Sequence, residues 1–217
     1  MKRRFLILLC GILLMGCGTR ETEETEETEG KVVAVQRAAA SMEKYYESID
    51  ELLADAALVV AGECVDTESF VADDNIVWTI ETYKVNECLY GDIENGSTIT
   101  IHFMGGNVKI KDYMESHHGI FKNRLLENDD KAAQSNTVSE NDLISVVYGD
   151  DKLPEVGEKS ILFLTESTLE DNAYFYVGAF MGAFYLVPEN AESGGSEKIY
   201  KGYVGEYTLS EIREEIK

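Results

Sequence analysis

The sequence predicts a mainly β domain, a small barrel or sandwich that opens with a long antiparallel hairpin. Two strand-forming runs, residues 57–65 and 76–90, flank a polar region that ends in Asp73, Asp74 and Asn75. A third run, residues 97–103, alternates apolar and polar side chains as a half-buried strand does. The chain also holds 12 tyrosines and only 2 prolines, a composition that favours strands.

Residues 1–16 have the pattern of a lipoprotein signal peptide. A basic start precedes an apolar run of about ten residues, which is short for a membrane-spanning helix. Leu14-Met15-Gly16-Cys17 resembles the lipobox of bacterial lipoproteins, in which the signal is cut before a cysteine whose sulfur carries a diacylglycerol. We therefore expect Cys17 to be lipidated and to hold the chain in the bilayer, on the extracytoplasmic face of the cell membrane. An uncleaved anchor helix and an ordinary secretory signal are the alternatives.

Residues 17–31 are expected to form the lipidated cysteine and a disordered acidic spacer. A repeat of Thr-Glu-Glu there offers no apolar face to bury, so self-repulsion keeps the segment extended. Over the whole chain, 19 basic residues stand against 41 acidic ones, which gives a net charge of −22. Such a surface repels phosphate backbones and argues against nucleic acid as a partner. Cations, basic proteins and neutral ligands remain open.

Residues 32–217 are predicted to form a single domain. Its first part, residues 32–56, has apolar side chains at helical spacing, and Ser48 with Glu51 fits a capping box for a helix over residues 49–55.

In the third strand, three apolar side chains are predicted to face the core and His102 to face solvent. Gly105 and Gly106 are expected to end this strand. Residues 107–152 form a long insertion with little regular pattern, in which we expect a helical stretch over residues 113–126 and a short strand over residues 142–148.

The last third of the chain returns to strands. We expect a buried strand within residues 153–164, then two strands within residues 174–187 joined by a bend at Gly178 and Gly182. An edge strand is expected within residues 196–203. A final helix follows, capped by Thr208 and Glu211.

This order of elements carries a family resemblance. The segments that carry it are residues 54–62, residues 83–91 (Tyr-Lys-Val-Asn-Glu-Cys-Leu-Tyr-Gly), residues 98–101 and residues 156–164. The chain resembles uncharacterised envelope lipoproteins of Gram-positive bacteria whose domain is similar to the OB-fold barrel of the netrin and metalloproteinase-inhibitor group. The resemblance implies an OB-like antiparallel barrel of five or six strands with short flanking helices.

In the inhibitors of that group, a free N-terminal cysteine docks on the protease zinc. Here Cys17 is expected to be lipidated and separated from the barrel by the acidic spacer, which departs from the inhibitor pattern. Protease inhibition is therefore the least favoured of the functions that the sequence leaves open.

Cys64 and Cys88 are the two cysteines left once Cys10 is removed with the signal and Cys17 is lipidated. The extracytoplasmic location expected for this chain permits a disulfide between them. A hairpin centred near residue 70 would displace them along the strands, so two buried thiols are the favoured interpretation, with the disulfide left open.

Possible metal ligands occur in loops. His117 and His118, with Asp112 and Glu115, could bind zinc, although solvated histidines are the simpler interpretation. Acidic clusters could bind calcium, but none has the EF-hand spacing, and turn chemistry explains them as well. These clusters are Asp73-Asp74-Asn75, Asn128-Asp129-Asp130 and Asp150-Asp151. We predict no metal site and no cofactor.

Motifs of known catalytic families are missing, including the nucleophile elbow, the phosphate-binding glycine loop and the zinc-protease motif. Glu63 and Glu81 could form a carboxylate pair, but charged residues within strands usually mark the solvent face. Trp78 could join an aromatic binding surface, with core packing as the alternative for most of the aromatic residues. The other candidates for that surface are Tyr83, Tyr90 and Tyr174-Phe175-Tyr176.

The sequence thus predicts a membrane-anchored, extracytoplasmic lipoprotein that acts as a binding module and not as an enzyme. Its expected partners are the bilayer, through Cys17, and an envelope protein, a peptide or a small ligand. A surface module that responds to calcium or zinc is the alternative.

Overall fold

The computed structural model describes residues 30–39, 44–73, 75–116, 139–149, 152–188 and 198–217. These residues form a mainly β structure with two sheets, which confirms the predicted class. The larger sheet has the strand order β11-β10-β9-β7-β2-β3-β4-β8, and the smaller one has the order β1-β6-β5. The expected signal peptide, Cys17 and nearly all of the acidic spacer lie outside the described residues.

The strands are β1 (Val32–Ala38), β2 (Leu58–Val71), β3 (Val77–Tyr90), β4 (Thr98–Met104), β5 (Gly106–Lys109), β6 (Leu143–Tyr148), β7 (Lys159–Glu166), β8 (Ala173–Tyr176), β9 (Ala183–Leu186), β10 (Ile199–Gly202) and β11 (Gly205–Thr208). The helices are α1 (Ile49–Ala54), α2 (Ile110–Ser116) and α4 (Leu209–Glu215).

The predicted hairpin is present and is longer than expected. β2 and β3 pair antiparallel from Val59 opposite Tyr90 to Val71 opposite Val77. Residues 66–71, predicted as part of a polar turn region, continue β2 with alternating exposed and half-buried side chains. The strand stays polar there because its outward side chains face solvent.

β2 and β7 separate two hydrophobic cores. β7 pairs antiparallel with the first half of β2, and both strands are buried on both faces. Val59 and Phe163 pack on the side of α1 and α4, whereas Val60 and Leu162 pack against β3, β4 and β8. The continuous apolar run in each strand, without polar alternation, reflects this burial on both faces.

β8 connects two parts of the larger sheet. It pairs parallel with β4, Thr100 lying opposite Ala173, and antiparallel with β7, Leu164 lying opposite Tyr176. The predicted bend after β8 is also present, with positive φ at Gly178 and Ala179 before β9 begins. β8 therefore places its aromatic side chains beside both neighbouring strands.

The smaller sheet corrects one expectation. β1 (Val32–Ala38) was predicted to be helical, and this prediction is wrong, because β1 pairs parallel with β6. Its β-branched valines suit a strand, and its partner lies more than 100 residues away in the sequence, where local spacing cannot indicate it. The predicted end of the third strand is confirmed, because β4 ends at Met104, directly before Gly105. Gly105 has φ +114 and redirects the chain from β4 into β5.

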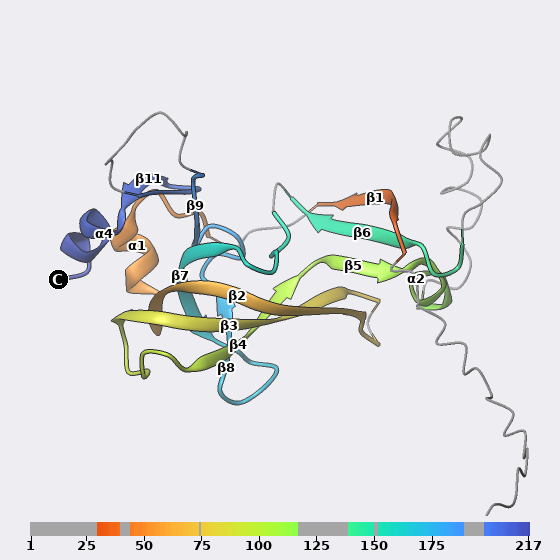
Figure 1. Ribbon diagram of the computed structural model, residues 1–217, viewed down its shortest axis with the longest axis horizontal. Helices are drawn as coiled ribbons and strands as arrows, with labels where there is room; N and C mark the ends of the chain where they lie inside the picture. Colours follow the sequence, from red (N-terminus) through yellow and green to blue (C-terminus); the bar gives the residue numbers. More distant parts are fainter. Residues whose placement is uncertain (1–29, 40–43, 74, 117–138, 150–151, 189–197) are drawn as a thin grey trace, which may run out of the picture.

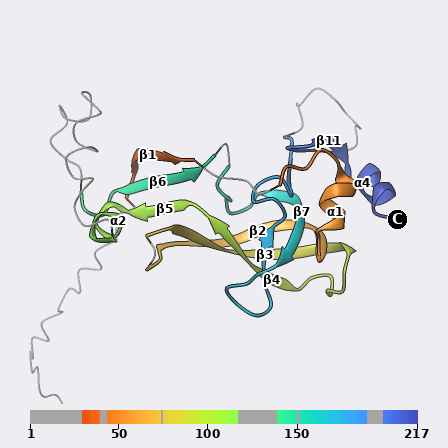
Figure 2. The same ribbon diagram turned by 180° about the vertical axis from the view of Figure 1, so that it is seen from behind.

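Figures 1 and 2 show α1, α4 and the C-terminus at one end of the molecule, and the smaller sheet with α2 at the other. Both predicted N-caps are confirmed, but the capping box of Ser48 and Glu51 is only half formed, because the Glu51 carboxylate accepts from the Glu47 N–H instead. Ser48 accepts a hydrogen bond from the Glu51 N–H, and Thr208 with Glu211 forms a full capping box.

The remaining predictions agree in part with the structure. The short strand expected at residues 142–148 is β6, and the strand expected within residues 196–203 is β10. β10 is not an edge strand as predicted, because it lies between β9 and the unpredicted β11. Of the helical stretch expected over residues 113–126, the described part ends at Ser116 with α2.

Candidate functional site

An exposed apolar row crosses the outer face of β2, β3 and β4. Strand pairing places Phe70 opposite Trp78, and Trp78 opposite Met104. Directly opposed side chains in antiparallel strands point to the same face, so the three form one line, here called the apolar row. Phe70 is 40% exposed and Met104 is 37% exposed, which leaves a hydrophobic stripe open to solvent.

One end of the apolar row enters a hollow of about 210 Å³, here called the aromatic hollow. Phe175 of β8 stands against Trp78 with their ring centroids 5.9 Å apart, and His102 lies edge-on to Phe175 at 5.8 Å. The aromatic hollow is lined by Trp78, His102, Phe103, Met104, Phe175, Tyr176 and Ala179. The predicted aromatic surface is thus divided, since Trp78 and Phe175 line the hollow whereas Tyr83 is fully buried in the core.

His102 was predicted to face solvent, and that prediction is wrong. It is 9% exposed because β8 lies beside β4 and brings Phe175 opposite it. Its Nδ1 is 3.2 Å from Ser167 Oγ, and its Nε2 is 3.4 Å from Glu170 Oε2. Ser167 Oγ also accepts a hydrogen bond from the Leu169 N–H at 3.1 Å. These contacts fasten the β7–β8 loop over the edge of the aromatic hollow.

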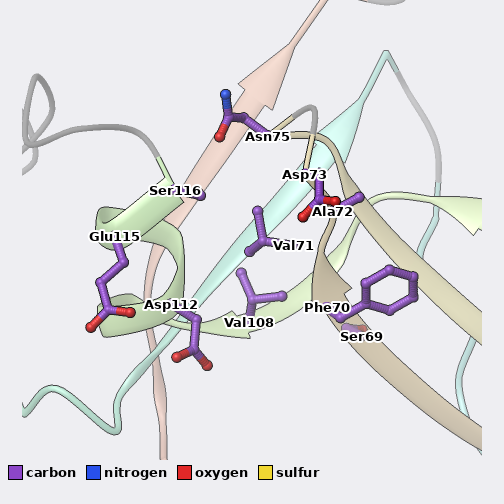
Figure 3. A pocket seen from close by; sticks show the side chains of 10 residues that line it. All are labelled: Ser69, Phe70, Val71, Ala72, Asp73, Asn75, Val108, Asp112, Glu115 and Ser116. Carbon is purple, nitrogen blue, oxygen red and sulfur yellow. The ribbon is translucent and has the colours of Figure 1, made fainter.

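A second hollow of about 540 Å³, here called the acidic hollow, lies between α2 and the inner side of the β2–β3 hairpin tip, where Ser69, Val71 and Val108 line it. Figure 3 shows Asp112 and Glu115 projecting from α2, with Asp73 and Asn75 at the tip of the β2–β3 hairpin. Phe70 also lines this hollow, but its ring projects away from α2. The ten lining residues include three carboxylates and no basic side chain.

The acidic hollow joins two groups of candidate ligands that are far apart in the sequence. Asp73 belongs to a predicted calcium cluster, and Asp112 and Glu115 to a predicted zinc cluster. Within the described residues, no group of three metal-ligating side chains lies close enough to hold an ion. His117, His118 and the remaining acidic clusters (Asn128-Asp129-Asp130 and Asp150-Asp151), together with Asp74, lie outside the described residues.

Glu81 was predicted to face solvent with Glu63, and for Glu81 this is wrong. It is only 2% exposed and accepts a hydrogen bond from the Tyr176 hydroxyl at 2.5 Å. Removal from water raises the pKa of Glu81 to about 7. Hydrogen bonds from Tyr176 and Cys64 lower this pKa, and the charge of Glu158 raises it further. Because Tyr176 also lines the aromatic hollow, this buried carboxyl lies directly behind the site.

Cys64 and Cys88 are both free thiols, as the favoured interpretation holds, but only Cys64 is buried as expected, and Cys88 is partly exposed. Strand register places Cys64 opposite Tyr83 and Cys88 opposite Val60, so the two cysteines lie at different levels of the hairpin. Burial, followed by the nearby Glu81 carboxylate, raises the pKa of the Cys64 thiol to about 12.

Thiol labelling should therefore distinguish the two cysteines. At about pH 8, iodoacetamide is expected to modify the partly exposed Cys88 and to leave Cys64 unmodified until the protein is unfolded, because the thiolate is the reactive form. Peptide mapping by mass spectrometry measures both sites. Equal labelling of Cys64 and Cys88 in the folded protein would contradict this.

Within the described ranges, no helix is long and apolar enough to cross a membrane. No family model matches this chain, and no curated protein or solved structure matches it significantly.

Proposed function

We propose that this protein is a lipid-anchored, extracytoplasmic binding module, not an enzyme, and that β2, β3, β4, β7 and β8 form its OB-like barrel. The pairing order supports the barrel, since β7, β2, β3, β4 and β8 lie side by side in this order in the larger sheet and β8 also pairs with β7. Counted along the chain, β3 and β4 are its second and third strands. The smaller sheet is then an addition to the barrel.

The observation that carries the proposal is the position of the apolar row. OB folds bind ligands on the face of their second and third strands, between the first and the fourth connecting loops. Here that face carries Trp78 and Met104. The two loops are the hairpin tip, with Asp73 at the acidic hollow, and the β7–β8 loop, with Glu170 at the aromatic hollow.

Binding can be measured without labelling, because Trp78 is the single tryptophan of the chain. The full chain carrying Cys17→Ser would be titrated with basic, neutral and acidic peptides and with N-acetylglucosamine oligosaccharides, and the emission of Trp78 recorded. We expect at least one of these probes to change the emission with a saturable dependence. Catalytic turnover of any probe, without a saturable change, would overturn the proposal of a non-enzymatic module.

Anchoring is tested by fractionation. If Cys17 carries the lipid, Cys17→Ser should move the protein from the membrane fraction to the aqueous fraction. The variant lacks the acyl chains, and these chains are what anchors such a protein in the bilayer. Cys88→Ser is the matched control and should stay with the membrane. Retention of the Cys17→Ser protein in the membrane would indicate an uncleaved anchor helix.

The acidic hollow favours a second candidate function, a module that responds to cations. Asp73, Asp112 and Glu115 carry the oxygen ligands that calcium prefers, but they do not lie close enough together to hold one ion, so an ion would have to draw α2 and the hairpin tip together. Calorimetry with Ca²⁺ and with Zn²⁺ tests it, and heat release with a rise in melting temperature is expected. If neither ion produces either signal, this second function is wrong.

A further inference from the structure

We propose that the aromatic hollow binds a quaternary ammonium group, as carried by choline and related small solutes. This inference rests on the proposed binding function and names the chemical class of its ligand. It concerns the aromatic hollow alone, with the strand face around it.

Aromatic rings form most of the wall of the aromatic hollow. Five of its seven lining residues carry a ring, and they come from β3, β4 and β8. The Trp78 and Phe175 rings stand 5.9 Å apart at an interplanar angle of 44°, and His102 lies edge-on to Phe175. Phe103 and Tyr176 form a second edge-to-face pair, with centroids 5.6 Å apart. Cationic groups are attracted to the faces of aromatic rings, and most strongly to tryptophan.

The aromatic hollow has room for a small group. Its volume of about 210 Å³ is below the roughly 300–1,000 Å³ of pockets that enclose drug-sized ligands. A trimethylammonium head occupies about as much space as three or four water molecules, at about 30 Å³ each. The hollow therefore accommodates such a head, whereas an oligosaccharide or a peptide strand would lie mostly outside it.

The lining side chains have few free hydrogen-bonding groups. Both ring nitrogens of His102 have polar neighbours, Ser167 and Glu170, and the Tyr176 hydroxyl donates to Glu81. The other lining residues are Trp78, Phe103, Met104, Phe175 and Ala179. Among their side chains the indole N–H is the one strong donor, and none is a strong acceptor. A primary ammonium or a guanidinium group would lose its hydration there without gaining acceptors, whereas a quaternary ammonium has no N–H to satisfy.

Two exposed carboxylates stand near the aromatic hollow without lining it. Glu68 of β2 lies opposite Ile80, two positions from Trp78 along β3, so it is a diagonal neighbour of Trp78 at roughly 7–8 Å. Glu170 Oε2 is 3.4 Å from His102 Nε2, and the Glu170 side chain is 62% exposed. Among the described residues, neither carboxylate has a lysine or arginine partner. Their charge favours a cation over a neutral apolar group of the same shape.

Basic side chains do not compete for this part of the sheet. The sequences of β2, β4 and β8 contain no lysine or arginine. In β3, Lys84 shares the face of Trp78 but lies six positions further along the strand, roughly 20 Å away. The net charge of −22 also attracts small cations from a distance.

The experiment uses the full chain with Cys17→Ser, choline as the probe, and the emission of Trp78 as the signal. We expect a saturable change of emission. The neutral tert-butyl analogue of choline should bind at least about ten-fold more weakly, because it lacks the cation–π attraction. Ethanolamine should also bind at least about ten-fold more weakly, because its ammonium group keeps its water. Phosphocholine should bind more weakly than choline, since the nearby carboxylates repel its phosphate.

Variants locate the site, with binding measured by saturation-transfer NMR on the methyl protons of choline. Trp78→Leu and Phe175→Leu each remove a ring from the hollow and keep apolar bulk, so each should weaken binding by about ten-fold. Phe70→Leu is the matched control, because Phe70 lies opposite Trp78 but does not line the aromatic hollow, and it should bind as the parent does. Circular dichroism checks that each variant is folded.

A pair of double variants tests the carboxylates. Glu68→Gln with Glu170→Gln should weaken choline binding by about three-fold, because two exposed charges near the hollow are removed. Asp92→Asn with Glu94→Gln removes the same charge from exposed residues elsewhere and should leave binding unchanged. Equal weakening by the two double variants would show attraction to net charge alone and would overturn the inference.

Other results would also overturn it. Equal affinity for choline and its tert-butyl analogue would make the hollow a purely apolar site, and equal affinity for ethanolamine would remove the preference for a quaternary group. Tighter binding of phosphocholine than of choline would replace the free solute with a phosphocholine headgroup. If choline does not bind but a peptide or an oligosaccharide still changes the emission of Trp78, this inference fails and the proposed binding function stands. If no probe binds, both fail.

Discussion

Replacing Glu81 with glutamine is expected to stabilise the folded protein at about pH 8 by up to roughly 3 kcal/mol. Glu81 is 2% exposed, and its ionised form is disfavoured there by loss of hydration. Glutamine has nearly the same shape and carries no charge. Its carbonyl oxygen can still accept the hydrogen bond from the Tyr176 hydroxyl.

The sign of the pH dependence follows from the direction of the shift. The pKa of Glu81 rises from 4.5 to about 7 on folding, so the folded state binds more protons between these values. The stability contributed by the protonated carboxyl is complete below about pH 4.5 and is lost progressively as pH rises through about 7. Glu81→Gln should flatten this part of the stability curve.

Urea unfolding at several pH values measures the effect. Glu63→Gln is the matched control, because Glu63 lies on the adjacent strand β2 and is partly exposed, and it should leave the slope unchanged. A parallel pH dependence in the parent and in Glu81→Gln would show that Glu81 is not the titrating group.

Phe163→Ala is expected to destabilise the protein by about 3–5 kcal/mol. Phe163 lies at the centre of β7, is completely buried, and packs against Phe184 with ring centroids 5.7 Å apart. Its truncation removes apolar contacts and leaves a cavity between the larger sheet and the α1–α4 layer.

The same truncation at an exposed position is the control. Phe70→Ala removes a phenylalanine that is 40% exposed, and a much smaller loss of stability is expected. Thermal unfolding followed by circular dichroism compares the two variants. Similar losses for Phe163→Ala and Phe70→Ala would contradict the placement of Phe163 in the core.

Local signals were sufficient for much of the fold. The Ser48 and Thr208 caps depend on hydrogen bonds to residues three positions away, so the sequence shows both partners together. The β2–β3 hairpin could also be predicted, because its two strands are consecutive in the sequence. The bend before β9 could be predicted because glycine marks it. These features need no knowledge of distant contacts.

The errors arose where a distant strand decides the environment. The alternation of side chains along a strand could not predict the burial of His102 and Glu81, because both are buried by β8. β8 covers His102, and its Tyr176 donates a hydrogen bond to Glu81. β1 was misread because its partner β6 follows a long insertion. In the site, Trp78 was recognised as a candidate, whereas Phe70 and Met104 were missed. The predicted hairpin is centred near residue 70 and leaves Phe70 in the turn, whereas the observed register, with Val71 opposite Val77, places Phe70 opposite Trp78.

The pairing of β8 with both β4 and β7 has a consequence for the order of folding. β2, β3 and β4 are consecutive and can pair as they leave the ribosome, since their contacts are local. β7 and β8 must then close chain segments of many tens of residues, because Leu58 lies opposite Leu164 and Thr100 opposite Ala173. The apolar row therefore assembles early, and the loop that carries Glu170 reaches it late, after the slow long-range steps.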